Sequence, residues 1–398
     1  MDDNFKCGKT LRPMMKALVV DAKWEPKPGY KVSPWENETK KVVCGNAIWK
    51  DPALLLKEVD PPKIGDKDLL IRVRRCGVCG SDIHFWERDD QGYMLYPGLT
   101  RFPCTIGHEF AGVVEKVGSG VGGFDVGDLV TSEEMIWCGE CTPCRDGYPN
   151  HCENLEEIGF TIPGAFAEYI GVGSRYCWKL NPILEVVEGE DEALDCGALV
   201  EPTSVAYNGI FVRGGGFMPG EDVAIYGAGP IGLAAIALCG AAGAGQIFAF
   251  EVKPERRELA KRMGANWVYD PTEVKPSSEV LARTDGRGVA LSVEAAGAPQ
   301  LTVPEMEKSL AINGKIVQIG RAAQRVPMYL ESFQVRRAQL LGAQGHSGHG
   351  TFHHVISLMA SGRVDLRQII TSRFPLDRAA EAIEKASKRV DGKVMVYA

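Results

Sequence analysis

The segment from residue 76 to residue 110 contains three side chains that are able to hold a metal ion: Cys79, His108 and Glu109. A thiolate, an imidazole and a carboxylate form a ligand set of mixed softness, which suits Zn²⁺. A catalytic zinc ion takes about three protein ligands and leaves one position open. Cys79 or His108 taken alone is equally compatible with an ordinary buried side chain, because cysteine is among the most buried residue types.

Two groups able to transfer a proton lie close to Cys79 in the sequence. The hydroxyl of Ser81 and the imidazole of His84 follow it within a few residues, and groups of both types can pass a proton onward. A Lewis-acidic metal beside such groups suits a substrate that carries a hydroxyl. We therefore interpret this segment as a zinc site that acts on an alcohol.

A second metal signal consists of four cysteines in a short polar segment: Cys138, Cys141, Cys144 and Cys152. Glycine, proline and charged residues separate them, so core packing does not explain the thiols. Structural zinc is held by a closed set of four thiolates, because full coordination leaves no position for a substrate. Such an ion cross-links a segment that is too polar to fold by burial. An iron–sulfur cluster or a redox dithiol would need different spacing or surroundings.

Glu201 is a candidate for a further role at the first metal site. Residues 199–204 are expected to begin a helix, with the Glu201 carboxylate at its start. We interpret Glu201 as a fourth zinc ligand or as the hydrogen-bond partner of a zinc-bound water. The alternative is an acidic residue that the helix dipole favours at a helix start.

The composition changes after residue 216, where a dinucleotide-binding pattern begins. An apolar strand expected at residues 222–226 continues directly into a glycine-rich turn and an apolar helix. The turn permits a tight bend and lets a pyrophosphate approach the helix N-terminus. Its expected cofactor-binding residues are Gly227, Gly229, Pro230, Ile231 and Gly232.

Glu251 ends the next expected strand, about twenty positions after the last glycine, where a carboxylate can bind the ribose hydroxyls of adenosine. A carboxylate there repels a 2′-phosphate, so NAD is favoured over NADP. Lys253, Arg256 and Arg257 follow, and basic groups can receive that phosphate. We interpret these residues as the polar face of the next helix and include Arg256 among the cofactor-binding residues.

Short apolar runs separated by turns indicate a β-rich domain in the first half of the chain. Residues 24–49 mix prolines, charges and tryptophans, and we expect an irregular insertion that serves as a cap or a subunit contact. Residues 1–14 are expected to be an unanchored lead-in. Strands are expected at residues 16–21, 69–74, 112–117 and 164–170.

Strands and helices alternate after residue 222, which predicts a doubly wound parallel sheet. Helices are expected at residues 255–263, 279–284 and 303–310, among others. We predict an α/β protein with a β-rich catalytic domain at 15–205, a dinucleotide-binding domain at 206–345, and a return to the first domain at 346–398. His346 and His349 lie among glycines, and they either face a substrate or form a polar turn.

The composition is that of a soluble globular protein, with 45% hydrophobic and 24% charged residues. The net charge of −7 argues against nucleic acid or an anionic membrane as a partner. The chain shows no signal-peptide pattern and no apolar run long enough to span a bilayer. We therefore expect a cytoplasmic protein whose twelve cysteines are metal ligands and buried thiols rather than disulfides.

On these motifs, which occur in family order, the chain resembles the zinc-dependent medium-chain dehydrogenase/reductase family. Glu201-Pro202 in place of a second cysteine ligand resembles the sorbitol and threonine dehydrogenase branch. The resemblance implies a GroES-like domain that carries both zinc ions, a Rossmann domain that binds NAD, and an active site in the cleft between them. It also implies a homodimer or homotetramer.

The resemblance further implies a role for each residue of the first zinc site. The zinc on Cys79, His108 and Glu109 would bind the substrate hydroxyl and lower its pKa. Ser81 would take the proton and pass it through the nicotinamide ribose to His84, while the alkoxide gives its hydride to the cofactor. Glu201 would tune ligand exchange at the metal, and Asp82 would support the metal ligands from behind.

The substrate class follows from a narrower resemblance. The insertion at residues 24–49 and the runs at 201–207 and 344–350 are most similar to dehydrogenases of inositol catabolism. We therefore expect a polyol or cyclitol substrate. The alternatives are an acyclic substrate of the sorbitol or threonine type, and a dinucleotide-binding sensor without catalytic activity.

Overall fold

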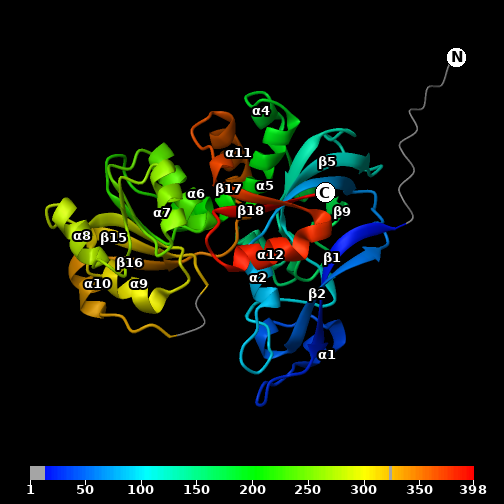
Figure 1. Cartoon of the computed structure of the whole chain (residues 1–398), viewed down its shortest axis with the longest axis horizontal. Helices are drawn as coiled ribbons and strands as arrows, with labels where there is room; N and C mark the ends of the chain where they lie inside the picture. The colour runs from blue at the N-terminus through cyan, green and yellow to red at the C-terminus, as the bar shows by residue number, and fades with distance from the viewer. Residues whose placement is uncertain (1–13, 322–324) are drawn as a thin grey trace.

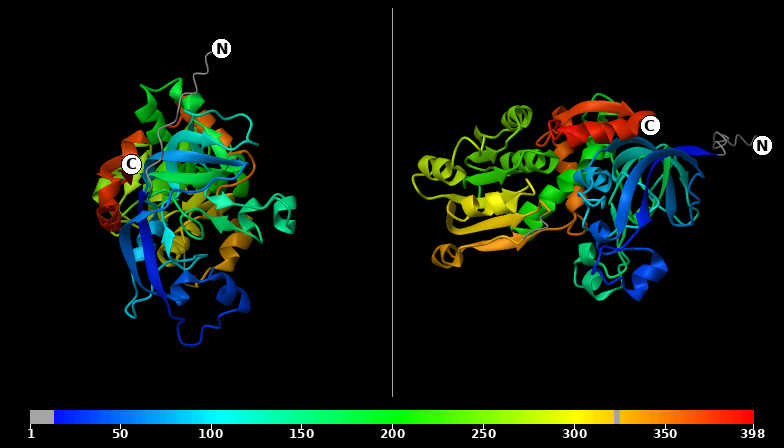
Figure 2. Two further views of the ribbon diagram at one scale, coloured as in Figure 1. Left: turned by 90° about the vertical axis from the view of Figure 1, so that its right-hand side faces the viewer. Right: turned by 60° about the horizontal axis from the view of Figure 1, so that its bottom comes forward.

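The computed structural model describes residues 14–321 and 325–398 (Figure 1). Residues 1–13 of the expected lead-in lie outside the described residues. Figures 1 and 2 show an elongated molecule in which a β-rich part and a sheet layered with helices lie end to end. No helix in the described ranges combines the length and the apolar character that a membrane crossing requires.

Two of the sheets in the β-rich part share a core. A three-stranded sheet has the order β2-β1-β4, and a larger sheet has the order β10-β6-β5-β3-β18-β17, with β9 also pairing with β3. Apolar residues of β3 such as Leu69, Ile71 and Val73 are buried in this core. The strands are β1 (Met15–Trp24), β2 (Trp49–Val59), β3 (Asp68–Gly77), β4 (Cys104–Thr105), β5 (Glu109–Val117), β6 (Leu129–Ser132), β9 (Tyr169–Gly173), β10 (Cys177–Lys179), β17 (Ile370–Pro375) and β18 (Lys393–Tyr397).

The second part is a six-stranded sheet with the order β13-β12-β11-β14-β15-β16. All its described pairings are parallel. Strands β11 and β12 are buried along their whole length, as expected where helices cover both faces of a parallel sheet. This confirms the doubly wound sheet. Its strands are β11 (Val223–Tyr226), β12 (Ile247–Phe250), β13 (Trp267–Tyr269), β14 (Val289–Glu294), β15 (Leu310–Gln318) and β16 (Gln339–Gly342).

In the second part, helices alternate with the parallel strands along the chain. Those that alternate with the parallel strands are α6 (Pro230–Ala241), α7 (Pro254–Arg262), α8 (Pro276–Arg283), α9 (Pro299–Met306) and α10 (Leu330–Arg336). The others used below are α1 (Pro34–Thr39), α2 (Gly80–Trp86), α3 (Thr142–Arg145), α4 (Asn181–Leu184), α11 (Thr351–Ala360) and α12 (Ala379–Ser387).

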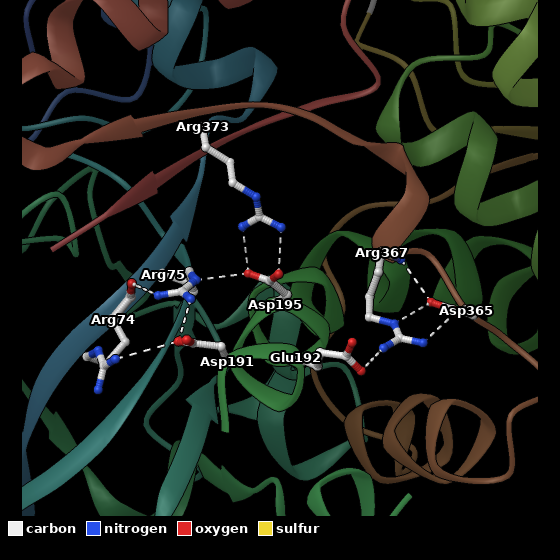
Figure 3. A network of polar contacts seen from close by, with 8 residues as sticks. All are labelled: Arg74, Arg75, Asp191, Glu192, Asp195, Asp365, Arg367 and Arg373. Atoms are coloured by element: carbon white, nitrogen blue, oxygen red, sulfur yellow. Dashed lines mark hydrogen bonds and ion pairs between the residues drawn. The ribbon is translucent and has the colours of Figure 1, made fainter. Parts of the chain in front are cut away.

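Helix α5 (Glu190–Tyr207) connects the two parts and continues into a π-helical turn, η4 (Asn208–Arg213). Asp195 on this helix pairs with Arg75 of β3 at 2.9 Å and with Arg373 of β17 at 2.6 Å, as Figure 3 shows. The helix is therefore tied to strands from both ends of the chain. Its course crosses the boundary expected at residue 205, and the boundaries 15–205, 206–345 and 346–398 stay a prediction.

The helix expected to begin at residue 199 begins at Glu190 instead, so Glu201 lies inside α5 and not at its start. That expectation was wrong because Pro202 resembles a proline of a first helical turn, whereas here it lies within the helix. The true start is marked by three acidic residues in the first turn, which the helix dipole favours.

Three further expectations need correction. The strand expected at 164–170 begins only at Tyr169. The insertion is not wholly irregular, because Ser33 and Glu36 form a capping box that starts α1. The helix expected at 303–310 ends at Met306, since Leu310 already pairs with Val289 in the parallel sheet.

Candidate active site

Cys79, His108 and Glu109 come together where β3, α2 and β5 meet. Cys79 precedes the first residue of α2, and Glu109 opens β5 opposite Gly77 of β3. Their ligand atoms all lie within 4.8 Å of one another. Gly107 makes the approach possible, because its φ is +89° and a Cβ there would come within 2.8 Å of the Phe166 ring.

These three side chains fit a zinc ion. A thiolate, an imidazole and a carboxylate converge on one point, as the donor types of a catalytic zinc site require. His108 and Glu109 are buried, and within the described ranges the buried Nδ1 atom of His108 has no hydrogen-bond partner. The donor chemistry and the spacing therefore agree with the sequence-based expectation, while the ligand set itself stays a prediction.

Asp82 supports this group from behind. Its Oδ2 accepts a hydrogen bond of 2.8 Å from the backbone N–H of Cys79, and its Oδ1 lies 4.0 Å from Nδ1 of His108. Burial raises the pKa of Asp82 to about 6. Burial acts to lower the pKa of His108, but the charges of Cys79 and Asp82 raise it well above its ordinary value. Zinc binding would displace that proton, because a ligating imidazole is neutral.

Lys393 is a residue of this site that the sequence-based reasoning missed. It opens β18, and its Nζ lies 2.5 Å from Oε2 of Glu109 and 3.1 Å from the carbonyl oxygen of Val78. Both charged side chains are 1% exposed. The sequence shows only a lysine as the first residue of an apolar strand, a signal too weak to identify its partner.

Glu201 belongs to a second buried group beside the first. Nε2 of His346 lies 3.2 Å from Oε1 of Glu201 and 3.4 Å from Oε2 of Glu134. The Glu201 charge contributes to the raised pKa of His108, so the two groups interact electrostatically. Whether Glu201 ligates the metal stays a prediction, and its carboxylate contacts His346 in this structure.

Charges of the second group shift pKa values within it and beside it. Burial acts to lower the pKa of His346, but its contacts with Glu134 and Glu201 raise it to about 10. Burial raises the pKa of Glu157 to about 8, and the charge of Glu134 adds to this effect. Neither Glu134 nor Glu157 was singled out from the sequence, because an acidic residue in a polar segment gives no sign that it is buried.

Ser81 and His84 lie one turn apart on α2 and therefore share a face of that helix. Oγ of Ser81 is buried and has no hydrogen-bond partner among the residues that the structure describes. His84 is 40% exposed, and its Nδ1 lies 3.2 Å from Oε2 of Glu87. Burial and the charge of Arg389 lower the pKa of His84. A buried hydroxyl and a partly exposed imidazole thus share one face of α2, while the proton relay itself stays a prediction.

The four cysteines of the second metal signal form one cluster in the lobe around α3, and all four sulfur atoms lie within 4.8 Å of one another. Sγ of Cys152 is 3.5 Å from Sγ of Cys138 and 3.8 Å from Sγ of Cys141. Backbone N–H groups of Glu140 and Cys141 point at Sγ of Cys138 and lower its pKa to about 6. These four residues fit a structural zinc ion with full thiolate coordination.

The dinucleotide pattern lies where β11 meets α6. Gly227 has a φ of +94°, and a Cβ on Gly232 would collide with the carbonyl oxygen of Gly227, so both positions require glycine. Pro230 and Ile231 form the first helical residues of α6. Glu251 at the end of β12 is buried, and its carboxylate accepts hydrogen bonds from the backbone N–H groups of Ala228 and Lys253.

The two neighbouring arginines have different surroundings. Nη1 of Arg256 lies 3.6 Å from where a Cβ of Gly229 would stand, so its guanidinium reaches the glycine-rich turn. Its Nε donates to the carbonyl oxygen of Asp391. Arg257 pairs with Asp270 at 2.7 Å and donates to the carbonyl oxygen of Glu251. Arg257 is thus engaged in holding β12 and the segment after β13, while Arg256 faces the expected pyrophosphate position.

Comparisons with known proteins identify the family of this chain. A model described as "Alcohol dehydrogenase GroES-like domain" matches residues 65–182, and one described as "Zinc-binding dehydrogenase" matches residues 230–361. The scyllo-inosose 3-dehydrogenase of Thermotoga maritima is 47% identical over 382 residues, which cover 93% of this chain and 96% of that protein. The chain belongs to the zinc-dependent alcohol dehydrogenase family. It is therefore an NAD(P)-dependent zinc dehydrogenase.

Further relatives and a solved structure are also similar to this chain. An L-threonine 3-dehydrogenase of Caldanaerobacter subterraneus subsp. tengcongensis is 33% identical over 346 residues, covering 86% of this chain and 94% of that protein. Among solved structures, a Thermotoga maritima protein assigned as an alcohol dehydrogenase superposes with a TM-score of 0.93 at 45% identity, over 96% of this chain and all of that one. The GroES-like domain and the Rossmann-type sheet are thereby confirmed.

Proposed function

We propose that this dehydrogenase oxidises a secondary alcohol of a cyclitol, of the scyllo-inosose type, with NAD⁺ as hydride acceptor. The observation that carries the proposal is the buried group of Glu134, Glu201 and His346, in which the Glu201 charge also acts on the pKa of His108. Such a group suits a ligand with several hydroxyl groups, because Oε1 of Glu134 has no hydrogen-bond partner within the described residues and an apolar alcohol would leave it so. The 47% identity to a scyllo-inosose 3-dehydrogenase supports the same substrate class.

In this proposal each side chain has a defined task. A zinc ion held by Cys79, His108 and Glu109 supplies Lewis-acid chemistry that lowers the pKa of the substrate hydroxyl. Oγ of Ser81, which is buried and has no other partner within the described residues, accepts the hydroxyl proton as the serine's own proton leaves toward His84. His84, on the same face of α2 and partly exposed, releases that proton to solvent.

Glu251 supports NAD over NADP as the cofactor. Its carboxylate is buried at the carboxyl end of β12, where it would bind the ribose hydroxyls and repel a 2′-phosphate. Arg257, which could otherwise neutralise such a phosphate, already pairs with Asp270. Gly227, Gly229 and Gly232 leave the backbone open for the pyrophosphate at the N-terminus of α6.

The test is the appearance of NADH absorbance with zinc-loaded protein and a panel of scyllo-inosose, myo-inositol, sorbitol, L-threonine and ethanol. Each substrate is paired with NAD⁺ and with NADP⁺. We expect the highest kcat/KM with a cyclitol and NAD⁺. Turnover confined to sorbitol or threonine would overturn the cyclitol assignment. Absence of turnover with every substrate, with zinc and NAD bound, would favour the dinucleotide-binding sensor.

A threonine-type activity is the second candidate. It is favoured by the 33% identity to an L-threonine 3-dehydrogenase over most of the chain. The same zinc-binding side chains and proton relay would serve either substrate, so the panel above separates the two. The expected homodimer or homotetramer and the expected cytoplasmic location stay predictions, which sedimentation analysis and cell fractionation address.

A further inference from the structure

Asn150 of the four-cysteine lobe binds the backbone of a segment nearly two hundred residues later. Its Oδ1 accepts from the N–H groups of His346 and Ser347 at 3.2 and 2.8 Å, and its Nδ2 donates to the carbonyl oxygen of Ser347 at 3.2 Å. The side chain is buried. The Asn150 amide thus pairs with three backbone groups. Because its oxygen accepts and its nitrogen donates, it fixes both the position and the orientation of the segment.

The rest of residues 345–350, here named the histidine loop, lies on the same lobe. A Cβ on Gly345 would come within 2.5 Å of Oδ1 of Asn150, and one on Gly348 would come within 2.9 Å of Cγ of Pro149. Nε2 of His349 lies 3.1 Å from the carbonyl oxygen of Gly147. The loop is rich in glycine because its backbone must approach the lobe closely.

A second anchor holds the start of the loop. Nδ2 of Asn208, in the π-helical turn after α5, donates to the carbonyl oxygens of Gln344 and Gly345 at 3.2 and 2.9 Å. The loop is therefore held between the four-cysteine lobe and the helix that carries Glu201. It has little freedom to move while both contacts persist.

This doubly anchored loop delivers His346 to the active site. The imidazole is 1% exposed, stacks edge-on against Phe352 and meets both Glu134 and Glu201. Nε2 of His346 lies between the two carboxylates, while Oε1 of Glu134 is a buried atom without a hydrogen-bond partner in the part of the chain that the structure describes. A ligand that supplies the missing partner of such a buried polar atom gains binding free energy from that hydrogen bond.

We propose that Asn150 is a positioning residue, through which the four-cysteine lobe holds His346 and Glu134 as a hydrogen-bonding wall for substrate hydroxyls other than the reacting one. The proposal rests on the proposed function and assigns the substrate class to named side chains. A substrate with several hydroxyl groups can donate to Oε1 of Glu134, whereas a simple alcohol leaves that buried atom unpaired. The lobe thereby acts in substrate selection as well as in stability.

The experiment compares Asn150→Ala and His346→Phe with two matched controls on exposed side chains, Asn37→Ala and His353→Phe. The readout is the ratio of kcat/KM for the preferred polyhydroxylated substrate to kcat/KM for propan-2-ol. We expect each test variant to lower this ratio about tenfold to a hundredfold, mainly through KM. The controls keep the wild-type ratio. His346→Gln, which restores a hydrogen-bonding group, recovers part of the loss.

A structural readout accompanies the kinetics. Amide hydrogen exchange of the histidine loop is expected to accelerate in Asn150→Ala at unchanged zinc content, and to stay near the wild-type rate in Asn37→Ala. An unchanged ratio in both test variants would overturn the proposal, as would unchanged loop exchange in Asn150→Ala. If wild-type protein prefers sorbitol to every cyclitol, the proposed function fails, while the ratio measured with sorbitol still decides the role of Asn150.

Discussion

Lys393 and Glu109 stand 284 positions apart in the chain, and Nζ of the lysine lies 2.5 Å from Oε2 of the glutamate. Both side chains are 1% exposed. Burial acts to lower the pKa of Lys393, but the charge of Glu109 raises it. The last strand of the chain therefore brings a counter-charge to a carboxylate of the expected zinc site. This pair links the stability of the fold to the electrostatics of the site.

Replacing Lys393 with methionine should lower the free energy of unfolding by about 3 kcal/mol, because an unpaired buried carboxylate remains. Chemical denaturation monitored by circular dichroism measures the loss. Lys388→Met, on an exposed position of the same region, is the control and should stay near the wild-type value. Equal stability of the two variants would show that the buried pair contributes nothing net.

Ser81→Ala should reduce kcat about a hundredfold or more, because a positioned proton acceptor contributes at least that much to such reactions. The affinity for NADH, followed by its fluorescence, should not change, since the hydroxyl lies at the metal site and not in the glycine-rich turn. Ser361→Ala changes a serine hydroxyl that donates to the Leu358 carbonyl oxygen and should keep full activity. Full activity of Ser81→Ala itself would exclude the relay.

Glu251→Ala should lower the ratio of kcat/KM for NAD⁺ to kcat/KM for NADP⁺ at least about tenfold. The change removes a hydrogen-bond acceptor for the ribose and a negative charge that opposes the 2′-phosphate. Glu273→Ala, at an exposed position after β13, controls for the loss of one negative charge. A constant ratio in Glu251→Ala would mean that another group sets cofactor preference.

The inserted segment should lose stability in acid. Burial acts to raise the pKa of Glu36, but hydrogen bonds from Ser33, Tyr30 and Val43 lower it below the ordinary value of 4.5. A carboxyl whose pKa is depressed by folding stabilises the native state above its unfolded pKa, and this contribution is lost as the pH falls through the lowered value. Stability should therefore decline from about pH 4.5 downwards.

Glu36→Gln tests this assignment. The amide cannot titrate and donates where the carboxylate only accepted, so the variant should be less stable than wild type at pH 7 and should approach it in acid. Thermal unfolding across a pH series measures the difference. Glu38→Gln, on the same short helix but exposed, should follow the wild-type curve. Parallel curves for Glu36→Gln and wild type would contradict the role of the carboxylate.

Motifs with members close in the chain were predictable because sequence spacing largely sets their spacing in space. The four cysteines between residues 138 and 152 form one cluster, and the glycines between 227 and 232 form the turn before α6. The parallel sheet followed from the alternation of strands and helices. The start of α5 did not, since Pro202 imitates a first-turn proline while the helix extends through it.

The sequence by itself therefore determined the family, the dinucleotide turn and the candidate metal-binding residues, because each is written in residue types at characteristic spacings. Only the tertiary structure decided which distant groups share a buried environment: Lys393 with Glu109, His346 with Glu134 and Glu201, and Asn150 with the histidine loop. The physical reason is that these contacts depend on how β18, α5 and the four-cysteine lobe pack together. No local pattern of residues encodes the distance between such elements.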